Sequence, residues 1–98
     1  MDGLQFAGYC GDLVAVKKHL AQGADVHASD DFGYTALHWN ARMACSGSSD
    51  RVAIVRILIE AGADPNGRDK SGATVLESAI EATAPADHIG ELKSHGAT

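Results

Sequence analysis

The chain has little of what secreted, membrane-spanning or metal-binding proteins require. Its 98 residues include two cysteines, two prolines and one tryptophan, and only 5% are aromatic. Cys10 and Cys45 form no metal-type spacing with each other or with the five histidines, so we expect reduced thiols and no metal site. No apolar run approaches the roughly 18 residues of a membrane span. The start, Met1-Asp2-Gly3, is not that of a signal peptide. We therefore expect a cytoplasmic protein that does not enter membranes.

Positive charge is also scarce. Eight Lys and Arg stand against thirteen Asp and Glu, giving a formal net charge of −5. This balance argues against binding nucleic acid through its phosphates and favours a protein partner with a basic surface. Hydrophobic residues still make up 45% of the chain, enough for one small folded domain.

What the chain does contain is an internal repeat. Gly23-Ala24-Asp25 recurs 39 residues later as Gly62-Ala63-Asp64. The turn-like stretch from Asp30 to Thr35 aligns with the stretch from Asp69 to Thr74 at the same offset, and His95-Gly96-Ala97 is a weaker third echo. Separate segments that share one period predict a repeat array.

The central unit reads as two helices. Thr35 is placed to cap a helix over residues 36–43, and Asp50 can cap a second over 51–61 that ends at Gly62. The second helix has apolar residues on nearly every side, so it must be covered on every side. A neighbouring unit on each flank would supply that cover.

These segments resemble the ankyrin repeat family over essentially the whole chain. The family signature T-P-L-H-x-A appears as Thr35-Ala36-Leu37-His38-Trp39-Asn40 and more faintly from Thr74 to Ala79. The resemblance implies a single all-α domain, 1–98. It would be an ankyrin repeat solenoid of three helix-turn-helix repeats, about 1–29, 30–68 and 69–98, with connecting β-hairpin loops. The family period is about 33 residues, so the central repeat carries an insertion near 44–49. Asn40 departs from the family's usual Ala.

The outer repeats are expected to act as end caps. We predict helices over 4–9 and 13–21 in the first, and over 75–82 and 88–94 in the third, with Asp87 capping the last. The last helix has few apolar anchors and contains a glycine, so we expect it to fray most readily.

The histidines and aspartates, which could in principle act in catalysis, are each expected to have structural roles here. The resemblance makes His38 the signature histidine, which bonds the backbone of adjoining turns. His19, His27, His88 and His95 are scattered and lie on expected polar faces. The turn aspartates, such as Asp30 and Asp69, suit bonds to their own backbone. We therefore expect no enzyme, no catalytic residue and no cofactor.

The resemblance also implies where a partner would bind, namely hairpin tips and the surface of the first helices. Phe32 and Tyr34 agree on physical grounds, because a turn gives little structural reason for large aromatics; packing of Phe32 back on its own hairpin stays open. Trp39 is either an inter-helix packing residue or a binding anchor. The candidate partner-binding residues are Tyr9, Asp31, Phe32, Tyr34, Trp39, Arg42, Met43, Lys70, Ser71 and Glu81.

The function expected is a non-catalytic, monomeric protein-interaction module. One alternative is a small bacterial immunity-type inhibitor of a toxin or enzyme, a role that the resemblance implies for short, acidic, single-domain ankyrin proteins. The chain runs from a Met to an ending typical of a final repeat, which suits a stand-alone protein. Another is a substrate of an asparaginyl hydroxylase at Asn66. Leu58 and Asp64 precede that residue in a pattern resembling the one such an enzyme accepts.

Overall fold

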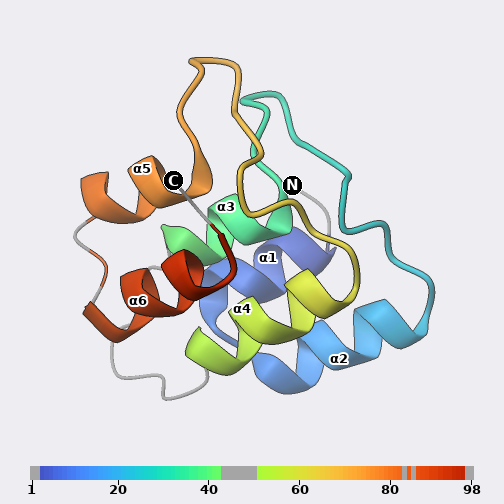
Figure 1. Cartoon of the computed structure of the whole chain (residues 1–98). Helices are drawn as coiled ribbons and strands as arrows, with labels where there is room; N and C mark the ends of the chain where they lie inside the picture. The colour runs from blue at the N-terminus through green and yellow to red at the C-terminus, as the bar shows by residue number, and fades with distance from the viewer. Residues whose placement is uncertain (1–2, 43–50, 83, 85, 97–98) are drawn as a thin grey trace.

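The computed structural model describes residues 3–42, 51–82, 84 and 86–96. Its six helices follow one another in antiparallel pairs (Figure 1). They are α1 (Gly3–Cys10), α2 (Leu13–Ala21), α3 (Ala36–Ala41), α4 (Arg51–Glu60), α5 (Val75–Glu81) and α6 (Ala86–Ser94). The first helices of the pairs, α1, α3 and α5, lie side by side in one layer, and α2, α4 and α6 lie side by side in the other. The predicted all-α array of three helix pairs is confirmed.

Two of the first-layer helices begin at the predicted threonine caps. The Thr35 side chain accepts from the backbone N–H of His38, and the His38 ring accepts in return from the N–H of Thr35. Thr74 and Glu77 make the same reciprocal pair at the start of α5. Each box satisfies two N–H groups that a helix start would otherwise leave unpaired.

The core lies between the two layers. Its largest fully buried apolar side chains include Leu4, Leu37, Ile54, Leu58 and Leu92. Ile57 and Ile59 of α4 are partly buried and pack against this core as well. The middle helix can carry apolar residues on most of its sides because α2 and α6 flank it and α3 lies beneath it, while Arg56 and Glu60 are exposed.

The loops between the pairs form the same tight turn twice. Asp30 Oδ1 accepts from the N–H groups of Phe32 (2.9 Å) and Tyr34 (3.0 Å). Its equivalent Asp69 accepts from those of Ser71 (2.9 Å) and Ala73 (3.0 Å). Both loops rise beyond the helix layers (Figure 1). Extended pairing in the described loops is limited to one isolated antiparallel bridge, Arg68 with Thr74.

Several sequence-based expectations need correction. The helix expected over 36–43 ends at Ala41, with Arg42 as its C-cap. The last helix begins at Ala86, so Asp87 lies in its first turn and does not cap it.

His88 is fully buried rather than on a polar face. Gly62 and Gly96 both end their helices with positive φ, and eight residues before each stand Ile54 and His88. His88 thus occupies a core position of the repeat. The expectations for Met43, Cys45, the 44–49 insertion and Asp50 fall outside the described residues.

None of the helices over the described ranges is long and apolar enough to cross a membrane.

Candidate functional site

Four aromatic side chains form a continuous row across α1, α3 and the first loop tip; we call Tyr9, Trp39, Tyr34 and Phe32 the aromatic row. Tyr9 and Trp39 meet edge to face, with centroids 5.1 Å apart. Trp39 meets Tyr34 in the same way at 5.2 Å, and Tyr34 lies 5.8 Å from Phe32 at a tilt of 34°. Edge-to-face pairs at these distances are favourable ring geometries. The row therefore joins residues that the sequence placed in two different repeats.

Trp39 is held to the loop as well as to the rings. Its Nε1–H donates to Asp30 Oδ2 at 2.8 Å, while Asp30 Oδ1 holds the turn. The indole is half-buried and its polar edge is satisfied. The packing interpretation of Trp39 is therefore supported by its contacts, and the same contacts fix one side of the row.

Arg42 and Glu81 extend the row toward α5. The Arg42 guanidinium carbon lies 5.1 Å from the centroid of the Tyr34 ring, within cation–π range. Arg42 Nη2 also lies 3.5 Å from Glu81 Oε2, and the Glu81 side chain is 68% exposed. An exposed ion pair of this kind adds little stability. What it does is hold a positive group over the Tyr34 ring.

His38 supports the row from beneath. The imidazole is fully buried, stacks on Tyr34 at 5.8 Å and lies 3.0 Å from the Thr35 hydroxyl through Nδ1. Burial lowers the pKa of His38, although Asp69 and the nearby Gly67 and Ala73 backbone act in the opposite direction. The ring is therefore neutral at pH 7. Its Nδ1 pairs with Thr35 at the start of the same helix, whereas the bond to adjoining turns that the resemblance implied stays a prediction.

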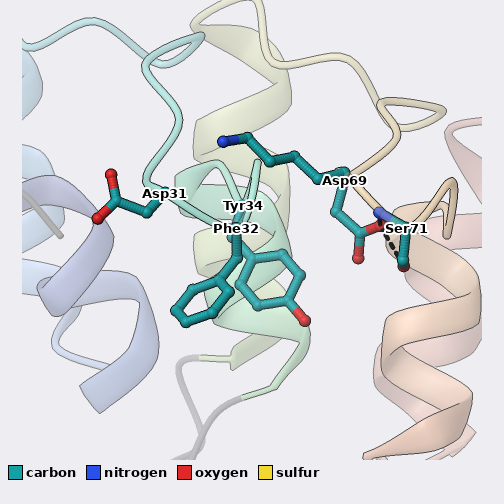
Figure 2. Close-up of a pocket in the computed structure, with 6 residues that line it drawn as sticks. Asp31, Phe32, Tyr34, Asp69 and Ser71 are labelled. Atoms are coloured by element: carbon teal, nitrogen blue, oxygen red, sulfur yellow. Dashed lines mark hydrogen bonds between the residues drawn. The ribbon is translucent and has the colours of Figure 1, made fainter.

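The two loop tips line an open hollow of about 310 Å³. Figure 2 shows the Phe32 and Tyr34 rings at its centre, with Asp31 on one side and Asp69 and Ser71 on the other. The six lining residues are Asp31, Phe32, Tyr34, Asp69, Lys70 and Ser71. Five of these are candidate partner-binding residues from the sequence analysis. Asp69 was not, because its turn-forming role was the only one the sequence indicated.

Phe32 is the exposed part of this arrangement. Its side chain is 64% exposed, and the ring contact it makes is with Tyr34. Tyr34 is half-buried among Trp39, His38 and Arg42. Phe32 is thus mostly exposed while its ring contact lies within its own loop, and Tyr34 links that loop to α3.

The site offers apolar rings and single charges rather than reactive groups. Among the residues that the structure describes, no three His, Cys, Asp or Glu side chains are grouped so as to hold a metal ion. The Ser71 hydroxyl donates to Asp69 at 2.6 Å, which fixes the turn. Chemically, the surface can bury an apolar side chain and pair with charges.

Comparison with known proteins gives one consistent family. The family description "Ankyrin repeats (3 copies)" matches residues 4–97. The mouse 2-5A-dependent ribonuclease is 48% identical over 65 residues, which are 65% of this chain and 8% of that protein. Human protein phosphatase 1 regulatory subunit 27 is 39% identical over 62 residues, 63% of this chain and 36% of its own length.

A solved structure matches the whole chain. The crystal structure of the human ASB11 ankyrin repeat domain superposes with a TM-score of 0.86 at 30% identity, over 100% of this chain and 41% of that one. The chain therefore spans less than half the length of each of these three relatives.

Proposed function

The chain belongs to the ankyrin repeat family, and on that premise we propose that it binds a protein partner through the aromatic row and the hollow between the loop tips. Ankyrin repeats are general protein-interaction modules. The proposed contact residues are those of the sequence prediction: Tyr9, Asp31, Phe32, Tyr34, Trp39, Arg42, Met43, Lys70, Ser71 and Glu81. We further propose a monomer that recognises a partner of mainly basic surface, in keeping with the net charge of −5.

The observation that carries this proposal is the exposed Phe32 on a fixed support. A large aromatic held by neighbouring rings loses little conformational freedom when a partner covers it. Aromatic residues and arginine are enriched in protein interfaces, and a few such anchors supply most of the binding energy. Phe32, Tyr34 and Arg42 together have this composition, and ring and cation contacts already order them.

The test is quantitative affinity capture from the native cell with three proteins: wild type, Phe32→Ala and Lys17→Ala. Lys17 is exposed on α2, in the opposite layer, and serves as the control. We expect Phe32→Ala to lose the main captured partner while its thermal midpoint stays close to wild type, because Phe32 is mostly exposed. Lys17→Ala should retain the partner. Equal capture by all three proteins would show that the tip is not the binding site.

The inhibitor alternative uses the same surface. If the captured partner is a toxin or another enzyme, the chain should inhibit it, and Phe32→Ala should inhibit less. If the enzyme keeps its full activity when it is saturated with the chain, the inhibitor role is excluded.

Asn66 carries the alternative proposal of a modification substrate. It is exposed on the second loop, its N–H donates to Asp64 Oδ1 at 2.9 Å, and its Nδ2 donates to the Gly96 carbonyl at 3.1 Å. Exposure is what a hydroxylase would need. Intact-mass analysis of the native protein tests it. A gain of one oxygen that maps to Asn66 is expected, and an unmodified residue in the purified native protein contradicts it.

A further inference from the structure

The two loop tips share one backbone turn but differ in the charge that they expose. The first aspartate of each tip is committed to the fold. Asp30 holds two backbone N–H groups and the Trp39 indole, and Asp69 holds two N–H groups and the Ser71 hydroxyl. Hydrogen bonds and the nearby His38 lower the pKa of Asp69, against the opposing effect of desolvation. Asp30 therefore uses both of its carboxylate oxygens within the fold, and Asp69 is buried with Oδ1 bound to its own turn.

The next residue in each tip is uncommitted. Asp31 and Lys70 stand at equivalent positions, 39 residues apart, and both are exposed. Within the described part of the chain, neither side chain has a hydrogen bond or an ion pair. They carry opposite charges and line the same hollow, which the Phe32 and Tyr34 rings also line.

The backbone fixes the distance between the two tips. The Lys70 N–H donates to the Phe32 carbonyl at 3.0 Å, and Gly33 approaches Lys70 so closely that a Cβ there would lie 2.7 Å from the Lys70 nitrogen. Figure 2 shows Asp31 and the second tip on opposite sides of the rings. The backbones that carry the negative Asp31 and the positive Lys70 are thus held together at one hollow, which Phe32 and Tyr34 also line.

We infer that, given the proposed function, the hollow takes a partner segment in which an apolar or aromatic side chain lies over Phe32 between a basic and an acidic residue. The basic residue pairs with Asp31 and the acidic residue with Lys70. Complementary rim charges contribute specificity and orientation more than affinity. A uniformly basic segment would place one of its charges against Lys70, and a uniformly acidic one would place a charge against Asp31. The pair therefore selects for charge order, while Phe32 supplies the apolar contact.

The test begins with a random peptide library displayed on phage and selected on the immobilised full chain. We expect enriched peptides that carry an apolar or aromatic residue flanked by one basic and one acidic residue. A selected peptide is then synthesised together with a copy in which the two charges are exchanged. Both are measured by fluorescence anisotropy against wild type and against the double variant Asp31→Lys with Lys70→Asp.

The selected peptide should bind the double variant roughly tenfold more weakly than wild type, because two rim ion pairs of up to about fivefold each are reversed. The charge-exchanged peptide should show the opposite preference. The matched control is Lys17→Glu with Glu60→Lys, which exchanges two exposed charges outside the hollow at constant net charge. It should leave both affinities unchanged. Circular dichroism confirms that each variant is folded.

The outcomes separate this inference from the proposed function. Peptides that lose affinity for Phe32→Ala but show no charge order, or only basic residues, overturn the inference and leave the proposed site intact. Peptides that bind Phe32→Ala as well as wild type, or the absence of any enriched peptide, overturn both.

Discussion

At the scale of the residue, Gly33 shows how one missing side chain shapes the candidate site. It has φ of +78°, and a Cβ added there would meet the Lys70 backbone nitrogen at 2.7 Å. Gly72 stands at the same place in the second turn with φ of +87°, and nothing lies within 4 Å of its added Cβ. The two glycines share a backbone requirement, but only Gly33 also lies in close contact with a neighbouring loop.

This pair allows a matched prediction. Gly72→Ala should lower the free energy of unfolding by about 1 kcal/mol, the cost of placing a side chain at positive φ. Gly33→Ala should lower it by at least about 1 kcal/mol more, because the two tips must also move apart. Urea denaturation of both variants measures the difference. Equal losses would show that the tips separate without cost and that the hollow is not rigid.

His38 gives a pH prediction at the same scale. Burial lowers its pKa below the ordinary value of 6.5, so the unfolded chain binds a proton first as the pH falls. Protonation therefore favours unfolding. The stabilising contribution is complete above about pH 7 and declines as the pH falls through 6.5 toward the lower folded pKa. Asp69 and Glu91 also have lowered pKa values, but their contributions are lost in a more acidic range, below ordinary values of 3.8 and 4.5.

The measurement compares wild type with His38→Gln, using urea denaturation from pH 7.5 to 5.5. Glutamine is a fitting replacement because Gln5 fills the equivalent buried position in the first repeat and donates to the Ala28 carbonyl at 3.0 Å. Wild type should lose more stability across this range than the variant. Since the other histidines are common to both proteins, parallel pH profiles would mean that His38 does not titrate differently on folding.

At the scale of the element, the short first-layer helices depend on their caps. Helix α5 has seven residues, and Thr74 Oγ1 accepts from the Glu77 N–H at 3.2 Å. Thr74→Ala should lower the free energy of unfolding by about 1 kcal/mol, because it leaves that N–H unpaired. Thr74→Ser retains the hydroxyl and should lose less. Thermal or urea denaturation compares the two, and equal losses would assign the effect to the methyl group instead of the cap.

The helices that the sequence predicted well are those whose signals are local. Thr35, Thr74 and Gly62 mark helix ends through bonds to residues a few positions away, so a linear reading finds them. The start of α6 was missed because Asp87 looked like a cap when read alone, whereas Ala86 already begins the helix. The expectation for His88 was wrong for a related reason. Its position eight residues before Gly96 shows that it is the third repeat's equivalent of Ile54, which is also buried in the core.

At the scale of the whole molecule, the repeat period predicted that Tyr34, Arg42 and Lys70 would share one surface, because stacked repeats bring equivalent positions together. It could not predict the Trp39–Asp30 bond or the Arg42–Glu81 pair. Those contacts depend on side-chain rotamers and on how closely two loops approach. The sequence could therefore predict which residues share this surface, but not which side chains contact one another.

The array also predicts unequal stability along the chain. Among the described helices, α4 packs against α2, α3 and α6, whereas α6 packs mainly against α4 and α5. Its apolar anchor is the fully buried Leu92. Glu91 pairs with Arg56 at N–O distances of 3.0 and 3.2 Å. Because the Arg56 side chain is 61% exposed, this ion pair adds little to the stability of α6. We therefore expect α6 to open before the rest of the molecule.

Native-state hydrogen exchange followed by NMR tests this expectation. Amides of α6 should exchange with a lower opening free energy than those of α4. Leu92→Ala, a buried truncation that costs about 2–5 kcal/mol locally, should remove most of the protection in α6 and leave α1 to α3 much less affected. Leu58→Ala serves as the control, because its side chain is fully buried in the central helix and should lower protection in every helix. If Leu92→Ala reduces protection equally throughout, the three pairs unfold as one cooperative unit and the end helix has no independent opening.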